Sequence, residues 1–157
     1  MKPTVYLETS IISYLVARPS KDVITAGHQL ATTEWWRQDR KKFEVVVSEL
    51  VVQEASQGDA EMARKRLELL QDIKTAPITA DAIRLAQTLV KKKVVPEKAS
   101  ADALHIAIAA IEQIDFLATW NFKHIANAKM QDKIEIVIRG EGFDPSKICT
   151  VEELIGE

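Results

Sequence analysis

The sequence predicts an α/β fold in which helices cover both faces of a parallel sheet. Short apolar runs rich in β-forming residues alternate with longer segments of helical periodicity, a pattern typical of βαβ units. The chain has 157 residues, of which 46% are hydrophobic, enough to bury a full core. Five glycines and five prolines are scattered along it and mark no linker. We therefore expect a single domain over residues 1–157.

Two βα units open the chain. Thr4–Leu7 is rich in β-formers and predicts the first strand, and the apolar residues after it recur at helical spacing until Pro19. A long helix with a polar face is expected over Lys21–Lys41. Glu44–Val47 predicts the second strand, and Ser48 is a natural N-cap for the short helix that follows.

The middle of the chain predicts helices around one very short strand. A helix over Ala60–Ile73 carries apolar residues on one face and charged residues on the other. Ala76–Ile78 predicts the third strand, and Thr79 caps the next helix, which ends in a run of lysines. Glu97–Ile114 is apolar nearly all round, which is typical of a buried helix.

The last two strands are expected at Asp115–Ala118 and Ile134–Ile138, with a short helix over Phe122–Met130 between them. Two further apolar stretches follow, around Ile148 and at Val151–Ile155. In parallel sheets of this kind ligands bind in the crevice beyond the carboxyl ends of the strands. The residues directly after each strand are therefore the candidates for a functional site.

Composition and absent motifs exclude several classes of function. The formal net charge of −2 argues against a protein that holds nucleic acid by bulk positive charge alone. Cys149 is the sole cysteine, which excludes a disulfide framework and a cysteine-based zinc site. Glycine motifs for nucleotides, zinc-hydrolase motifs and a nucleophile elbow are absent. No apolar stretch approaches the length of a membrane span, so we expect a cytoplasmic protein without a membrane partner.

Three acidic residues lie where an apolar environment or a sheet crevice is expected. Glu8 follows the first strand, Glu54 lies in the helix after the second, and Asp102 is near the start of the buried helix. Each could be a solvated or helix-start acid, but no lysine or arginine lies nearby in the sequence to pair with them. Converging carboxylates are costly unless a divalent cation lies between them, and hard oxygen ligands suit Mg²⁺ or Mn²⁺.

Taken in order, these segments resemble the PIN domain, and among its members the toxin-like VapC-type ribonucleases. The matching segments are Glu8-Thr9-Ser10 after the first strand, Glu54, Ala101-Asp102-Ala103, and Thr119-Trp120-Asn121. The resemblance covers about residues 4–138 and leaves 139–157 as a C-terminal tail. It implies a three-layer α/β/α sandwich with a five-stranded parallel sheet, and a metal-dependent endoribonuclease that hydrolyses RNA with Mg²⁺ (or Mn²⁺).

The resemblance implies a role for each matching residue. The expected catalytic residues are Glu8, Glu54, Asp102 and Asn121. The first three look like the metal-binding acids of the family, and Asn121 stands where many members have a fourth acid. Ser10 looks like a hydroxyl that orders the first acid or a metal-bound water, and Thr119 looks like the hydroxyl residue that opens the fourth motif.

Aromatic and imidazole side chains near these motifs allow two interpretations each. His105 shares a helix face with Asp102, so it could touch substrate or the residues around the metal, or pack as a hydrogen-bonded core residue. Trp120 could stack on a base or fill the core. The pair Trp35-Trp36 precedes basic residues, so it could bind RNA or a partner, or pack against a neighbouring element.

Two departures from the family pattern bear on activity. Glu8 is one methylene longer than the usual aspartate, and Asn121 is neutral. The Asn121 side chain still offers a carbonyl oxygen, so one metal ion is expected to bind and a second site would be weak. The rival hypothesis is a catalytically weak PIN scaffold that binds RNA or a protein partner. Failure to bind Mn²⁺ at millimolar concentration would favour the scaffold.

Partners also follow from the resemblance. Toxin-like members are held by a small antitoxin protein and often form dimers, so an antitoxin partner and a homodimer are implied alongside the RNA substrate. Basic residues gather in two segments, 35–43 and 91–98, while the residues from 140 onward are mostly acidic. With the low net charge, this pattern predicts modest, site-focused affinity for RNA.

Overall fold

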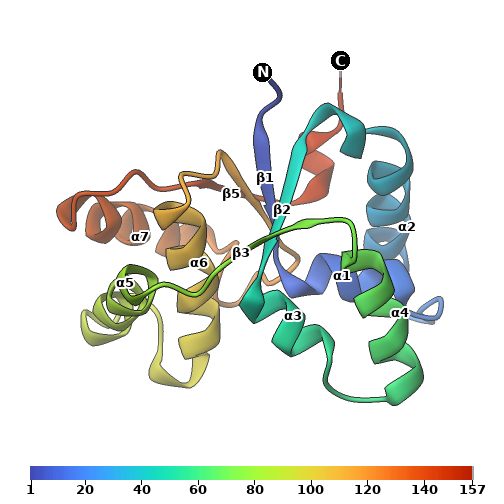
Figure 1. Ribbon diagram of the computed structural model, residues 1–157, viewed down its shortest axis with the longest axis horizontal. Coiled ribbons are helices and arrows are strands. Elements are labelled where there is room, and N and C mark those ends of the chain that lie inside the picture. Colours follow the sequence, from blue (N-terminus) through green and yellow to red (C-terminus); the bar gives the residue numbers. More distant parts are fainter. Residues whose placement is uncertain (157) are drawn as a thin grey trace.

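A parallel sheet of five strands lies at the centre of residues 1–156, the part of the chain that this computed structural model describes (Figure 1). The strands are β1 (Thr4–Leu7), β2 (Glu44–Ser48), β3 (Lys74–Ala76), β4 (Phe116–Ala118) and β5 (Lys147–Cys149). They lie in the order β3-β2-β1-β4-β5, and all neighbours pair in parallel. After β1 the chain forms β2 and β3 on one side of it, and then crosses to form β4 and β5 on the other side. The boundary between β1 and β4 is therefore the topological switch point, where sheets of this kind bind ligands.

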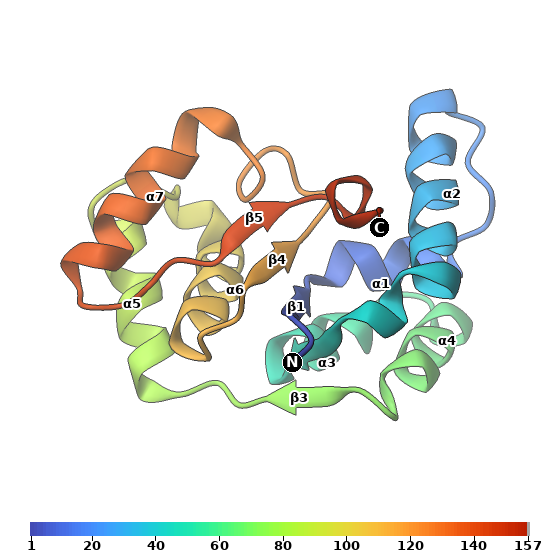
Figure 2. The same cartoon turned by 90° about the horizontal axis from the view of Figure 1, so that it is seen from above.

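Helices cover both faces of the sheet, which gives the predicted three-layer arrangement (Figure 2). The helices are α1 (Thr9–Val16), α2 (Val23–Gln38), α3 (Glu49–Ala55), α4 (Ala60–Leu70), α5 (Ala80–Lys91), α6 (Ser100–Ile111) and α7 (Ala128–Gly140). α1 to α4 pack together on one side, and α5 packs against α6 and α7 on the other. Within residues 1–156, no helix is long and apolar enough to cross a membrane.

The central strand and α6 form the middle of the core. Val5, Tyr6 and Leu7 are fully buried, as expected for a strand with helices on both faces of its sheet. α6 is buried along most of its length, and α5 packs along it. The apolar character of this helix therefore predicted its position correctly.

The first two strands confirm the prediction. β1 has the predicted bounds, and β2 is longer by Ser48, whose hydroxyl accepts the N–H of Val51 and so caps α3. α2 is shorter than the predicted Lys21–Lys41, because the Asp22 side chain caps its start and a 3₁₀ turn separates its end from β2. The predicted helix over Glu97–Ile114 likewise begins with a 3₁₀ turn before α6.

The third strand is displaced from the predicted Ala76–Ile78. It pairs with β2 over Lys74–Ala76, and Ala76 lies opposite Ser48, the last residue of β2. The next residue is Pro77, which has no N–H to continue the ladder. The observed strand therefore ends at Ala76, the first residue of the predicted strand.

The predicted strand at Ile134–Ile138 is wrong, because these residues belong to α7. Ile134, Val137 and Ile138 are buried at helical spacing, whereas Ile136 is 70% exposed. The alternating isoleucines resemble a strand pattern, but the helix buries Ile134, Val137 and Ile138 on one face and leaves Ile136 in solvent. The fifth strand is instead at Lys147–Cys149, beyond the expected boundary of the core at residue 138.

The predicted helix over Phe122–Met130 is also wrong. Residues 122–125 form turns, and α7 starts at Ala128 after its N-cap Asn127. The backbone carbonyl of Asn121 accepts the N–H groups of Ile125 and Ala126, which closes the turn before a helix can propagate. The segment is therefore a tight loop at the carboxyl end of β4.

Candidate active site

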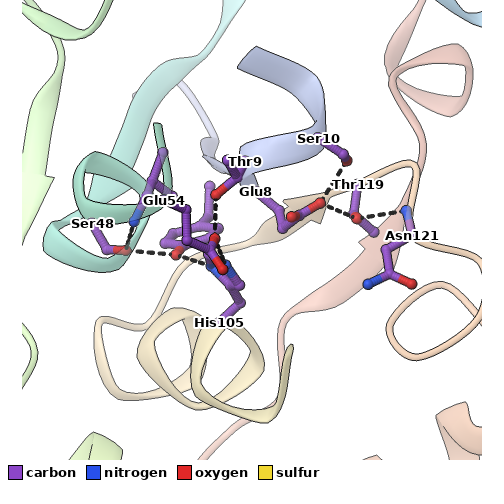
Figure 3. A network of polar contacts seen from close by, with 10 residues as sticks. Glu8, Thr9, Ser10, Ser48, Glu54, His105, Thr119 and Asn121 are labelled. Atoms are coloured by element: carbon purple, nitrogen blue, oxygen red, sulfur yellow. Dashed lines mark hydrogen bonds and ion pairs between the residues drawn. The ribbon is translucent and has the colours of Figure 1, made fainter. Parts of the chain in front are cut away.

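The candidate site lies at the carboxyl edge of the sheet, where β1 and β4 end side by side (Figure 3). Glu8 directly follows β1 and is the residue before α1. Its backbone N–H donates to the carbonyl of Ala118 at 3.1 Å, which ties the end of β1 to the end of β4. The parallel pairing of these strands thus brings Glu8 next to Thr119, although the two residues are far apart in the sequence.

The Glu8 carboxylate is 6% exposed and held by two hydroxyls. Its Oε1 accepts hydrogen bonds from Ser10 Oγ at 2.5 Å and from Thr119 Oγ1 at 2.6 Å (Figure 3). The hydroxyls are themselves oriented by the loop after β4, since the N–H of Trp120 donates to Ser10 Oγ and the N–H of Asn121 donates to Thr119 Oγ1. The carboxylate is therefore anchored through one oxygen.

Glu54 is anchored in the same way from α3. Its Oε1 accepts from Thr9 Oγ1 at 2.5 Å and pairs with His105 Nε2 at 2.7 Å. Partial burial acts to raise the pKa of Glu54, but the contacts with His105 and Thr9 outweigh it and hold the pKa below the ordinary value. Glu49, on the same helix, is exposed. Of the two α3 acids, Glu54 is the one that lies at the site.

A buried hydrogen-bond chain supports Glu54 from below. His105 is fully buried, and its Nδ1 lies 2.6 Å from the hydroxyl of Tyr6, which lies 2.7 Å from Ser48 Oγ. Ser48 Oγ also accepts the N–H of Val51. All partners are satisfied when Ser48 donates to Tyr6, Tyr6 donates to Nδ1, and Nε2–H donates to Glu54. In this arrangement Nε2 of His105 carries the hydrogen that it donates to Glu54.

Tyr6 keeps its proton throughout the ordinary pH range. Burial raises its pKa far above the usual value, and the charges of Glu8 and Glu54 act in the same direction. The Tyr6 hydroxyl is therefore a permanent donor, as the chain to His105 requires.

Asp102 lies in the first turn of α6 and is partly buried. Burial raises the pKa of its carboxyl above the ordinary value; hydrogen bonding to the Asn121 side chain opposes this shift, and the Glu8 charge adds to it. The Asn121 Oδ1 accepts the N–H of His124 at 3.0 Å, so the amide group of the side chain is the part available to Asp102. Asn121 therefore acts as a donor to Asp102, and its carbonyl oxygen caps a turn.

The donor groups at this edge are suited to a metal ion. Glu8, Glu54 and His105 offer ligand atoms that all lie within 4.8 Å of one another. Asp102 is outside this group, although its charge interacts with that of Glu8. Among residues 1–156, no lysine or arginine forms an ion pair with these carboxylates, and the second oxygen of Glu8 and of Glu54 has no hydrogen bond. Free carboxylate oxygens without a cationic partner fit Mg²⁺ or Mn²⁺.

The structure thus brings every predicted site residue to this edge, with three supporting residues to which the sequence patterns assigned no role in the site. Thr9, Tyr6 and Ser48 contact Glu54 either directly or through His105. Tyr6 carried a usable signal, because a tyrosine in the middle of a buried strand requires a hydrogen-bond partner. Thr9 lies in the matching segment Glu8-Thr9-Ser10, but its contact with Glu54 depends on how α1 and α3 pack.

Comparison with known proteins gives the fold relatives. The sequence matches the family described as the PIN domain over residues 5–128. VapC20 from Mycobacterium tuberculosis, a toxin that cleaves the sarcin-ricin loop, superposes with a TM-score of 0.56 at 15% identity, covering 76% of this chain and 92% of that one. VapBC2 from Rickettsia felis, bound to a DNA fragment of its promoter, gives 0.55 at 18% identity, covering 76% and 89%. A search of curated protein sequences found no match.

Proposed function

The chain belongs to the PIN domain family, and from this premise we propose that it is a divalent-metal-dependent endoribonuclease and the toxin of a toxin–antitoxin pair. The observation that carries the proposal is the convergence of Glu8 and Glu54 at the switch point of the sheet, with Asp102 near enough to Glu8 for their charges to interact. A nuclease of this family requires such a concentration of carboxylates. The relatives with the same fold include a toxin that cleaves the sarcin-ricin loop and a VapBC2 protein bound to promoter DNA.

The chain's own residues would prepare the site for a cation. Ser10 and Thr119 hold one oxygen of Glu8, and Thr9 and His105 hold one oxygen of Glu54. Each carboxylate therefore keeps a fixed orientation while its second oxygen stays free. We assign Glu8, Glu54 and Asp102 as the ligands of the cation, and Asn121 as the residue that positions Asp102. Bound there, Mg²⁺ or Mn²⁺ would supply an acidified water and neutralise charge on the scissile phosphate.

The test is cleavage of a mixed RNA pool with Mg²⁺ or Mn²⁺ by the wild type, Asp102→Asn and Glu54→Gln. Both variants are expected to lose at least about 100-fold in rate, the effect typical of removing one group that stabilises charge in a transition state. Glu49→Gln is the matched control, because Glu49 is exposed on the same helix as Glu54 and should leave the rate unchanged. Equal cleavage by wild type and Asp102→Asn would refute the assigned site.

A toxin role makes a separate prediction in cells. Induced expression of the wild type is expected to arrest growth, and Asp102→Asn is expected to abolish the arrest. Co-expression of a small protein from the neighbouring reading frame should relieve it, as for a cognate antitoxin. The family resemblance also implies a homodimer, which sedimentation of the pure chain measures. If the wild type cleaves RNA but its expression leaves growth unchanged, the protein is a housekeeping nuclease and not a toxin.

One observation favours a second function, a catalytically weak scaffold that binds RNA or a protein. Asn121 stands where many relatives have an acid, and its carbonyl oxygen is engaged by the N–H of His124. The site therefore has one charge fewer than a full set of four acids. Calorimetric titration with Mn²⁺ discriminates between the two functions: absence of binding at millimolar metal supports the scaffold.

A further inference from the structure

We propose that Phe122, on the loop between β4 and α7, is a stacking platform for one nucleobase of the RNA next to the cleaved bond. The inference rests on the proposed nuclease function and adds the residue that positions the substrate. Phe122 is the third residue after Thr119, whose hydroxyl donates to Glu8 at 2.6 Å, and 47% of its surface is exposed. An exposed aromatic residue therefore follows the segment that holds Glu8 at the carboxyl end of β4.

The loop holds Phe122 in this position. The carbonyl of Asn121 accepts the N–H groups of Ile125 at 3.2 Å and Ala126 at 2.8 Å. The side-chain amide of Asn127 donates to the carbonyl of Phe122 at 3.1 Å. Because hydrogen bonds hold the backbone on both sides of Phe122, binding of a base would order less of this loop than of a free one.

Buried and half-buried aromatic rings support Phe122 from behind. The ring of Trp120 stacks on that of His28, with centroids 4.1 Å apart and planes 16° apart, and on that of Tyr14 at 6.1 Å and 14°. Trp120 is 6% exposed and its indole N–H donates to Thr32 Oγ1. Phe122 rests edge-on against this stack, 6.0 Å from Trp120. Trp120 is therefore a core residue, and the ring left for a base is Phe122.

The surroundings of the ring favour RNA over an apolar protein surface. The next residue, Lys123, is exposed, and the backbone N–H of the half-buried His124 donates to Asn121 Oδ1 at 3.0 Å. The ring of His28 lies 5.9 Å from that of Phe122, centroid to centroid. Basic groups around an exposed aromatic ring match a base attached to a phosphate, since every base has a π-face and the backbone is anionic.

The experiment compares Phe122→Leu, which keeps an apolar side chain, with Phe122→Trp, which keeps a stacking face. Single-stranded RNA with 2-aminopurine at each position in turn is titrated in EDTA, where no cleavage occurs. One position should be quenched by the wild type and by Phe122→Trp, but not by Phe122→Leu. The RNA affinity of Phe122→Leu should fall about 5- to 100-fold, the range of one stacked base. Ile136→Ala, exposed on α7, is the control and should bind like the wild type.

An abasic substitution provides the second measurement. Removing the base at the quenched position should lower wild-type affinity by the same factor as Phe122→Leu, and should not lower the affinity of Phe122→Leu further. If 2-aminopurine is quenched and the abasic site and Phe122→Leu are not additive, but no metal-dependent cleavage occurs, the nuclease function is refuted and the platform is supported. Cleavage with no quenching at any position, or wild-type affinity in Phe122→Leu, would overturn the platform. Loss of binding to a purified protein partner by Phe122→Leu, with RNA binding unchanged, would assign the ring to protein docking instead.

Discussion

His105 Nε2 lies 2.7 Å from Glu54 Oε1, so a fully buried imidazole holds a carboxylate that faces the candidate site. The other ring nitrogen is held by Tyr6, a residue of the central strand. The orientation of Glu54 is thereby fixed by the middle of the core, in addition to the helix that carries it. His105 is thus packed and hydrogen-bonded in the core, and it also contacts Glu54 at the candidate site.

Replacing His105 should therefore weaken metal binding. His105→Leu removes the donor to Glu54 and should raise the Kd for Mn²⁺ about 10- to 100-fold, the usual effect of losing a group that orients a metal ligand. His105→Gln places an amide N–H near the position of Nε2 and should recover most of the affinity. Calorimetry with Mn²⁺ measures both variants.

Tyr6→Phe serves as the control for the His105 variants, because it removes the hydrogen bond between Tyr6 and His105 and leaves the one between His105 and Glu54 in place. It should lower the free energy of unfolding by about 1–3 kcal/mol, the usual effect of leaving a buried hydrogen-bonding group without its partner, and should change the Kd for Mn²⁺ less than His105→Leu does. If His105→Gln binds Mn²⁺ no better than His105→Leu, the positioning role of the imidazole N–H is wrong.

Asp102→Asn should stabilise the metal-free protein at neutral pH. Burial raises the pKa of Asp102 in the folded state, so the ionised carboxylate costs stability above that pKa, and the cost disappears as the pH falls below the unfolded value. Each kcal/mol corresponds to about 2–4 °C in Tm for a chain of this size. Thermal unfolding in EDTA should show a higher Tm for the variant at pH 7, and the difference should shrink toward pH 4. A lower Tm at pH 7 would contradict this.

Only one of the two basic segments should matter for RNA. Lysines of the turn between α5 and α6 lie where α6 starts, at the end of the molecule that carries Asp102, whereas the basic residues before β2 lie at the opposite edge of the sheet (Figure 1). The double variant Lys92→Glu with Lys98→Glu should bind RNA more weakly. The plot of log affinity against log salt should become shallower by about 0.7 for each RNA phosphate that the variant no longer neutralises.

Arg37→Glu with Lys41→Glu is the matched control, because it changes the net charge equally at the far edge and both residues are exposed. Its salt dependence should stay within error of the wild type. An equal effect of the two double variants would mean that net charge, and not a located contact, governs RNA binding.

Cys149 should be nearly inert in the native protein. Burial raises the pKa of its thiol to about 12, and the charge of Glu153 acts in the same direction, so almost no thiolate exists near pH 8. Reaction with a chromogenic disulfide reagent should be slow in buffer and complete in denaturant. Rapid reaction in buffer would show that β5, which carries Cys149 at the edge of the sheet, opens readily.

Several elements could be predicted because local pattern and tertiary environment agree in them. The β-formers of Thr4–Leu7 and the apolar circumference of α6 identified the central strand and the buried helix. The prediction failed at Ile134–Ile138, where the residues fit two periods at once. The helix prevails there because it buries Ile134, Val137 and Ile138 together, a choice that depends on α5 as the neighbour.

The sequence by itself determined the fold class and predicted the acids of the candidate site, because a carboxylate after a buried strand with no cation nearby is costly unless it has a function. Only the tertiary structure decided how those acids are held. Thr119 reaches Glu8 because β1 and β4 pair in parallel, and His105 reaches Glu54 because α3 and α6 meet at the same edge. These contacts join residues that are distant along the chain, so no local pattern records them; strand pairing and packing produce them.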